Sequence, residues 1–145
     1  KKYPDKQLVV KPHPQSDFMN NAIELINETD SNAKIILDAN LPELINDCDL
    51  VIGFNTSTIL LESLILQKPT ISLITDDWAK ENEIMKMNAV MIIDEIDKVE
   101  SGISKILSDK NYEDEIKNNS KKFLDDYLSN HEIASEQLVK TLKKI

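Results

Sequence analysis

The chain has 145 residues, of which 41% are hydrophobic and 30% are charged, which suits one globular domain over residues 1–145. Lysine and arginine total 17 against 26 acidic residues, and the net charge of −9 argues against nucleic acid or an anionic membrane as the main partner. Cys48 is the single cysteine and there are two histidines, so neither an internal disulfide nor a structural zinc site is expected.

The first part of the chain predicts a strand, a helix and a second strand. Residues 7–11 are rich in β-branched side chains, and Pro12 ends the run because proline cannot donate to a central ladder. Apolar residues recur at helical spacing over 18–26, and 34–37 form another short apolar run. A β-α-β unit is therefore expected here.

The middle of the chain continues this alternation of short strands and helices. Strands are expected at residues 49–53, 68–74 and 89–93, and helices at 41–46, directly after Thr58, and at 78–87. The strand at 49–53 is a continuous apolar run, which is typical of a strand that is covered on both faces. Cys48, just before it, is expected to be a small core residue and not a nucleophile.

Residues 95–145 change the pattern to three successive helices. Their apolar stripes are Ile96, Val99, Ile103 and Ile106, then Tyr112, Ile116, Phe123 and Tyr127, then Ala134, Leu138, Leu142 and Ile145. Together with the preceding alternation, this predicts an α/β fold: an open, mostly parallel, five-stranded Rossmann-like sheet with helices on both faces and a helical C-terminal stretch.

Two polar loops follow predicted strands, and ligands of such sheets bind beyond the carboxyl ends of the strands. One loop contains Lys11 and His13, and the other contains the run Asn55, Thr56, Ser57 and Thr58 at the start of a helix. The first amides of a helix lack internal partners and carry partial positive charge, so they favour an anion. An imidazole can donate a hydrogen bond to phosphate. The two loops together predict a phosphate site.

Simpler interpretations of the same residues stay open. The run 55–58 also fits ordinary helix capping, and His13 also fits a loop histidine without a role. Glu62 fits a solvent-facing or salt-bridged carboxylate, and Lys11 fits a surface charge at the end of a strand. The stretch 76–78 after the fourth strand fits either a contact to a base or sugar or a simple aspartate cap.

Several motifs resemble the C-terminal, donor-binding domain of GT-B glycosyltransferases. They are Lys11-Pro-His-Pro14, then Asp49-Leu-Val-Ile-Gly-Phe-Asn-Thr-Ser-Thr58, then Leu61-Glu-Ser-Leu64 and Lys68-Pro69. The most similar subset is the bacterial capsule, sialyl- and polysialyltransferases, together with the CDP-glycerol glycerophosphotransferases. The resemblance implies that His13 contacts the nucleotide phosphate and acts catalytically. It also implies that Ser57 and Thr58 hold the same phosphate, and that Glu62 matches a position that contacts ribose in many GT-B enzymes.

The resemblance also implies what lies outside these motifs. The substrate would be a nucleotide-activated sugar or CDP-glycerol, with no metal and no further cofactor. The acceptor site and catalytic base would belong to a separate N-terminal domain, so this chain is expected to be an excised part that is inactive alone. A cytoplasmic location is expected, with peripheral membrane association of the full-length protein. Gln67 departs from the family, which often has glycine before the Lys-Pro pair.

Three other functions are considered. A sugar-nucleotide 2-epimerase shares the two-domain plan, and a flavodoxin-like interaction domain shares the fold without a ligand. A dinucleotide-dependent oxidoreductase is disfavoured, because the only glycines, Gly53 and Gly102, cannot form the Gly-x-Gly-x-x-Gly turn.

Overall fold

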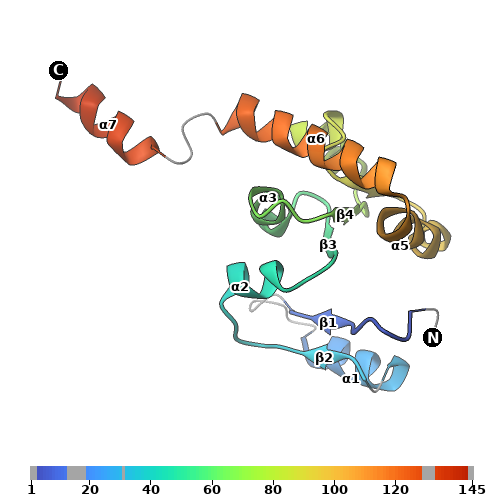
Figure 1. The fold of residues 1–145 in the computed structure, drawn as a ribbon. Helices are drawn as coiled ribbons and strands as arrows, with labels where there is room; N and C mark the ends of the chain where they lie inside the picture. The colour runs from blue at the N-terminus through green and yellow to red at the C-terminus, as the bar shows by residue number, and fades with distance from the viewer. Residues whose placement is uncertain (1–2, 13–18, 31, 129–132, 144–145) are drawn as a thin grey trace. The chain divides into compact units, whose positions relative to one another are not determined.

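The computed structural model describes residues 3–12, 19–30, 32–128 and 133–143 (Figure 1). The chain divides into two compact units, Lys1–Leu41 and Pro42–Ile145. None of the helices in the described ranges combines the length and apolar composition needed to cross a membrane.

The first unit contains one parallel strand pair and one helix. Strand β1 (Val9–Val10) pairs with β2 (Lys34–Ile35), and α1 (Met19–Thr29) connects them. The amides of Lys34 and Ile36 donate to the carbonyls of Leu8 and Val10, at 2.9 and 3.0 Å. The predicted β-α-β unit is thus present, with strands shorter than the sequence indicates.

The second unit is built on a three-stranded parallel sheet. Its order is β3 (Val51–Phe54), β4 (Thr70–Leu73) and β5 (Met91–Ile93). The predicted α/β class and parallel strand direction are confirmed. The five expected strands are all found, but hydrogen bonding assigns them to one two-stranded and one three-stranded ladder instead of a single sheet.

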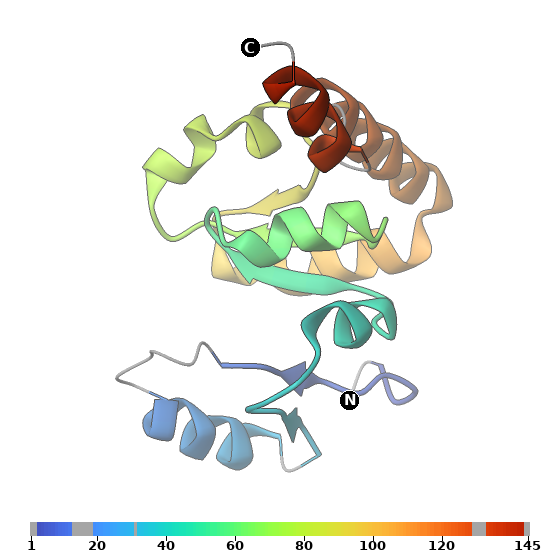
Figure 2. The same cartoon turned by 90° about the vertical axis from the view of Figure 1, so that its left-hand side faces the viewer.

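Helices cover both faces of the three-stranded sheet, as predicted (Figures 1 and 2). Helix α3 (Thr58–Ile65) packs closely on one face because Gly53 has no side chain: a Cβ there would lie 2.8 Å from Leu60 Cδ2. Helix α5 (Val99–Ser108) packs on the other face at Gly102, where a Cβ would lie 2.4 Å from Ile93 Cδ1. Each face therefore has one glycine at a close helix–sheet contact.

Each face has its own hydrophobic core. The α3 side also involves α6 (Lys110–Tyr127), and its buried residues are Leu60, Leu64, Ile74, Ala79, Ile84, Met85, Ala89, Val90, Phe123 and Leu124. The α5 side is smaller and buries Ile71, Met91, Ile93 and Ile106. Buried apolar area is the main stabilising contribution to such a sheet, and here it comes from both faces.

The other helical elements are short, apart from α7. Helix α2 (Leu41–Asn46) has the predicted bounds, and α7 (Ala134–Leu142) follows the gap at 129–132. The single helix expected over 78–87 is wrong. It is divided into η1 (Asp77–Glu81) and α4 (Glu83–Lys86), because Asn82 is extended and its side chain accepts a hydrogen bond from the Ile84 amide.

The first residue of one predicted helical stripe lies outside its helix. Ile96 has the spacing of the α5 stripe but lies on η2 (Ile96–Lys98), before that helix begins, and is 87% exposed. The other residues of this stripe, Val99, Ile103 and Ile106, pack in the α5-side core.

Candidate functional site

The carboxyl ends of the three strands in the second unit meet at one level. Phe54, Leu73 and Ile93 are the last residues of β3, β4 and β5, and they are register partners across the sheet. We call the segments that follow them, residues 55–58, 74–78 and 94–95, the carboxyl edge. In open parallel sheets this edge is where ligands bind.

Asn55 connects two of these segments. Its backbone has φ +47°, in the left-handed region that asparagine tolerates better than most residues. Its side-chain amide donates to Thr75 Oγ1 at 2.8 Å and to Asp76 Oδ2 at 3.0 Å. Its side-chain oxygen accepts from the amides of Thr75 and Asp76, at 2.9 and 3.2 Å. Asn55 therefore fixes the loop after β4 against the turn after β3.

A buried hydroxyl on β4 stabilises the same turn. Ser72, in the middle of β4, is 0% exposed, and its hydroxyl donates to the Asn55 carbonyl at 2.7 Å. The Asn55 amide in turn donates to the Leu73 carbonyl at 2.9 Å. Backbone and side chain of Asn55 are thus both committed to structure, which makes it a positioning residue for this edge.

The start of α3 follows directly. Ser57 occupies the N-cap position with φ −55° and ψ 141°, but its side chain makes no capping hydrogen bond. Ser57 is therefore the N-cap residue by position, but its hydroxyl does not cap the helix. Ser57 and Thr58 are both exposed. An eight-residue helix thus begins at this edge with an uncommitted serine hydroxyl beside its first amides.

Glu62 lies one helical turn beyond Thr58 and is half-buried. Residues four apart share a helix face, so the carboxylate and the start of α3 lie along one side of this helix. Thr56, in the turn itself, is half-buried.

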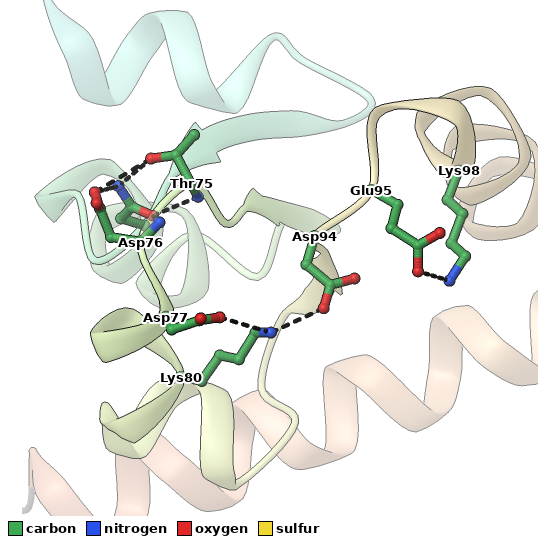
Figure 3. Close-up of polar contacts among 8 residues, drawn as sticks. Thr75, Asp76, Asp77, Lys80, Asp94, Glu95 and Lys98 are labelled. Carbon is green, nitrogen blue, oxygen red and sulfur yellow. Dashed lines mark hydrogen bonds and ion pairs between the residues drawn. The ribbon is translucent and has the colours of Figure 1, made fainter.

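The rest of the edge is rich in carboxylates (Figure 3). Lys80 on η1 lies between two of them, 2.9 Å from Asp94 Oδ2 and 3.2 Å from Asp77 Oδ1. Its hydrogen bonds to Asp94 and then to Asp77 raise the pKa of the Lys80 ammonium, and the Lys80 contact lowers the pKa of Asp94. Glu95 is paired with Lys98.

These ion pairs have a consequence for anion binding. Lys80 and Lys98 are both held by carboxylates, so the described part of this edge offers a phosphate mainly neutral donors, namely amides and hydroxyls. A phosphate bound there would gain from a cation supplied by another segment. Lys11 and His13 are the cation and imidazole that the sequence predicts for this role.

Lys11 and His13 belong to the other unit. Lys11 is half-buried just after β1. His13 lies outside the described residues, as does His131, so the predicted meeting of the His13 loop with residues 55–58 stays a prediction. The Cys48 thiol is half-buried and donates to the Leu44 carbonyl at 3.2 Å, and burial raises its pKa, which fits a structural cysteine.

Sequence reasoning missed Ser72 and Thr75, which hold the edge together with Asn55. Ser72 interrupts an otherwise apolar strand, and a buried hydroxyl needs a hydrogen-bond partner; that was the available signal. Within the described ranges, no group of His, Cys, Asp or Glu side chains is placed to hold a metal ion.

Comparison of the chain with protein-family models gives no match, and comparison with curated proteins gives none either. The fold and the carboxyl edge define an α/β domain with a parallel sheet, and function has to be argued from the residues of that edge.

Proposed function

We propose that this chain is the nucleotide-binding part of a glycosyltransferase, or of a glycerophosphotransferase, that acts in surface polysaccharide synthesis. One observation carries the proposal: α3 begins at the carboxyl edge with exposed Ser57 and Thr58, and the Ser57 hydroxyl is not used for capping. Helix starts of this kind bind phosphate through amides and hydroxyls. The motif resemblance adds His13 and Lys11 as further phosphate ligands.

The chemistry follows from a phosphate bound at this position. The acceptor hydroxyl oxygen attacks the anomeric carbon of the sugar, or the phosphorus of an activated glycerol. The bond to the nucleotide breaks, and its electron pair goes to the leaving phosphate oxygen. The α3 amides, Ser57, Thr58 and His13 stabilise the charge that develops on that oxygen. A base on a separate acceptor-binding domain takes the hydroxyl proton.

The rigid turn gives these donors a fixed direction. Asn55 and Ser72 hold the backbone that leads into α3, so the donors need little reorganisation when charge develops on the phosphate. Glu62, on the same side of α3 as Thr58, is assigned to a ribose hydroxyl. The full-length protein would associate with the membrane peripherally.

Calorimetry with cytidine and uridine nucleotides tests the proposal. The Ser57→Ala, Thr58→Val double variant is expected to lower affinity about 10- to 100-fold, because hydroxyl hydrogen bonds to a charged phosphate are lost. Ser101→Ala is the matched control, since Ser101 is an exposed serine in the first turn of another helix, and it should leave affinity unchanged.

His13→Ala tests the predicted role of the second loop. It should weaken nucleotide binding by about 1.5 to 3 kcal/mol if a charged hydrogen bond is lost, whereas His131→Ala should not. Absence of any nucleotide affinity in the unmodified chain would instead support a flavodoxin-like interaction domain.

A further inference from the structure

An exposed tryptophan lies at the carboxyl edge. Trp78 on η1 is 62% exposed, whereas the next residue, Ala79, is 0% exposed. A large aromatic side chain usually stabilises a protein by being buried, so a tryptophan on a polar surface segment is an unusual arrangement. An exposed ring at this edge can contact a bound ligand.

The backbone that carries Trp78 is held on both sides. Before it, Asp76 is bound through its amide and its carboxylate by the Asn55 side chain. After it, Ala79 donates to the Asp76 carbonyl at 3.0 Å, and Lys80 pairs with Asp77 and Asp94 (Figure 3). The indole is therefore presented from a fixed segment.

The segment that carries Trp78 is linked to the start of α3 by one side-chain contact. Asp76 contacts Asn55 directly, and Trp78 is two residues further on, a span of at most about 7 Å between Cα atoms. Ser57 is two residues from Asn55 on the other segment. The ring and the α3 amides therefore belong to two segments that leave the same Asn55–Asp76 contact, and each lies within a few residues of it.

The chemistry around the ring suits a nucleobase. The edge is acidic, so a second anionic group is disfavoured there, whereas a neutral planar ring is not. Bases stack on aromatic side chains, and carboxylates accept hydrogen bonds from ribose hydroxyls and exocyclic amines. We infer that Trp78 stacks on the base of the nucleotide whose phosphate lies at the start of α3; this inference rests on the proposed function.

The chain offers a direct reporter of this contact, because Trp78 is its only tryptophan. Titration with CMP, UMP, AMP and GMP is expected to quench the intrinsic fluorescence with the same dissociation constant that calorimetry gives. Ribose 5-phosphate, which has the phosphate and sugar without a base, should bind more weakly and leave the fluorescence unchanged.

Variants test the energetic role of the ring. Trp78→Ala should lower nucleotide affinity about 5- to 150-fold and leave ribose 5-phosphate affinity unchanged, while Trp78→Phe should retain most of the binding. Ile96→Ala is the matched control: it also removes an exposed apolar side chain after a strand of the same sheet, but one without an aromatic face. Circular dichroism verifies that each variant is folded.

The outcomes separate the two proposals. Nucleotide binding by calorimetry with unchanged fluorescence and unchanged affinity of Trp78→Ala overturns the stacking inference alone. An equal loss of affinity for nucleotides and ribose 5-phosphate also overturns it, because the ring would then act on the phosphate site. Absence of binding by every nucleotide overturns both the inference and the proposed function.

Discussion

The two compact units differ in how deeply their side chains are buried. Lys1–Leu41 contains a helix and two strands of two residues each, and its described side chains are half-buried or exposed, with none fully buried. Pro42–Ile145 contains all the fully buried side chains described, most of them in two clusters on opposite faces of one sheet. Both units have the local sequence signals of a parallel α/β fold.

This difference shows that a sequence that favours a strand does not by itself make the strand stable. Val9 and Val10 are as β-branched as Ile71 or Ile92, yet only the second unit covers its strands with helices on both faces. A segment of about forty residues rarely buries enough surface to be stable by itself. We therefore expect the second unit to supply most of the free energy of unfolding.

Substitution of one buried leucine should give the largest effect. Leu60 on α3 is 0% exposed, so Leu60→Ala is expected to lower the free energy of unfolding by about 2 to 5 kcal/mol through lost burial and an added cavity. Leu25 of the first unit is 64% exposed, and Leu25→Ala should change it by at most about 0.5 kcal/mol. Urea unfolding followed by circular dichroism measures both. Similar losses in the two variants would contradict the comparison.

Removal of the Asn55 side chain should have an intermediate effect. Asn55→Gly keeps the left-handed backbone but removes the hydrogen bonds to Thr75 and Asp76, so a loss of about 1 to 2 kcal/mol is expected. Asn88→Gly is the matched control, because Asn88 has φ +50° at a helix end, and it should be neutral or slightly stabilising. The same urea unfolding experiment measures both. Equal changes in the free energy of unfolding for the two variants would show that the Asn55 side chain does not contribute to stability.

Gln67 should give the smallest effect, and in the opposite direction. It ends α3 with φ +55°, and the amides of Gln67 and Lys68 donate to the carbonyls of Leu64 and Ser63, which is a Schellman motif. Glycine adopts this backbone without strain, so Gln67→Gly should raise the free energy of unfolding by about 0.5 to 1 kcal/mol. A decrease would indicate that the Gln67 side chain itself stabilises the helix end.

The sequence predicted the fold class because periodicity and proline placement are local signals. Helix α2, the five strand positions and the three C-terminal helices all follow from them. What local signals could not predict depends on tertiary context. Asn82 interrupts a helix by capping the next one, and Ile96 keeps helical spacing just outside its helix. The pairing of five strands into separate ladders is likewise not encoded in spacing.

The candidate site could likewise be predicted only in part from the sequence. The start of α3 at residues 57–58 could be placed from sequence, because hydroxyl residues between a buried strand and an apolar helix are a strong signal. The role of Asn55 could not, since its partners Thr75 and Asp76 lie about twenty residues further on. The contribution of His13 stays a prediction for the binding experiments.

The distribution of glycine has a practical consequence for protein engineering. Gly53 and Gly102 are the only glycines, and each lies where a helix touches the sheet, while the left-handed positions among the described residues are occupied by Asn55, Gln67 and Asn88. In a random library screened for soluble, folded variants, a side chain at position 53 or 102 would require Leu60 or Ile93 to shift, so we expect fewer replacements at these two positions. Positions 67 and 88 should instead accept glycine readily, so directed evolution of this domain has its easiest gains at its helix ends.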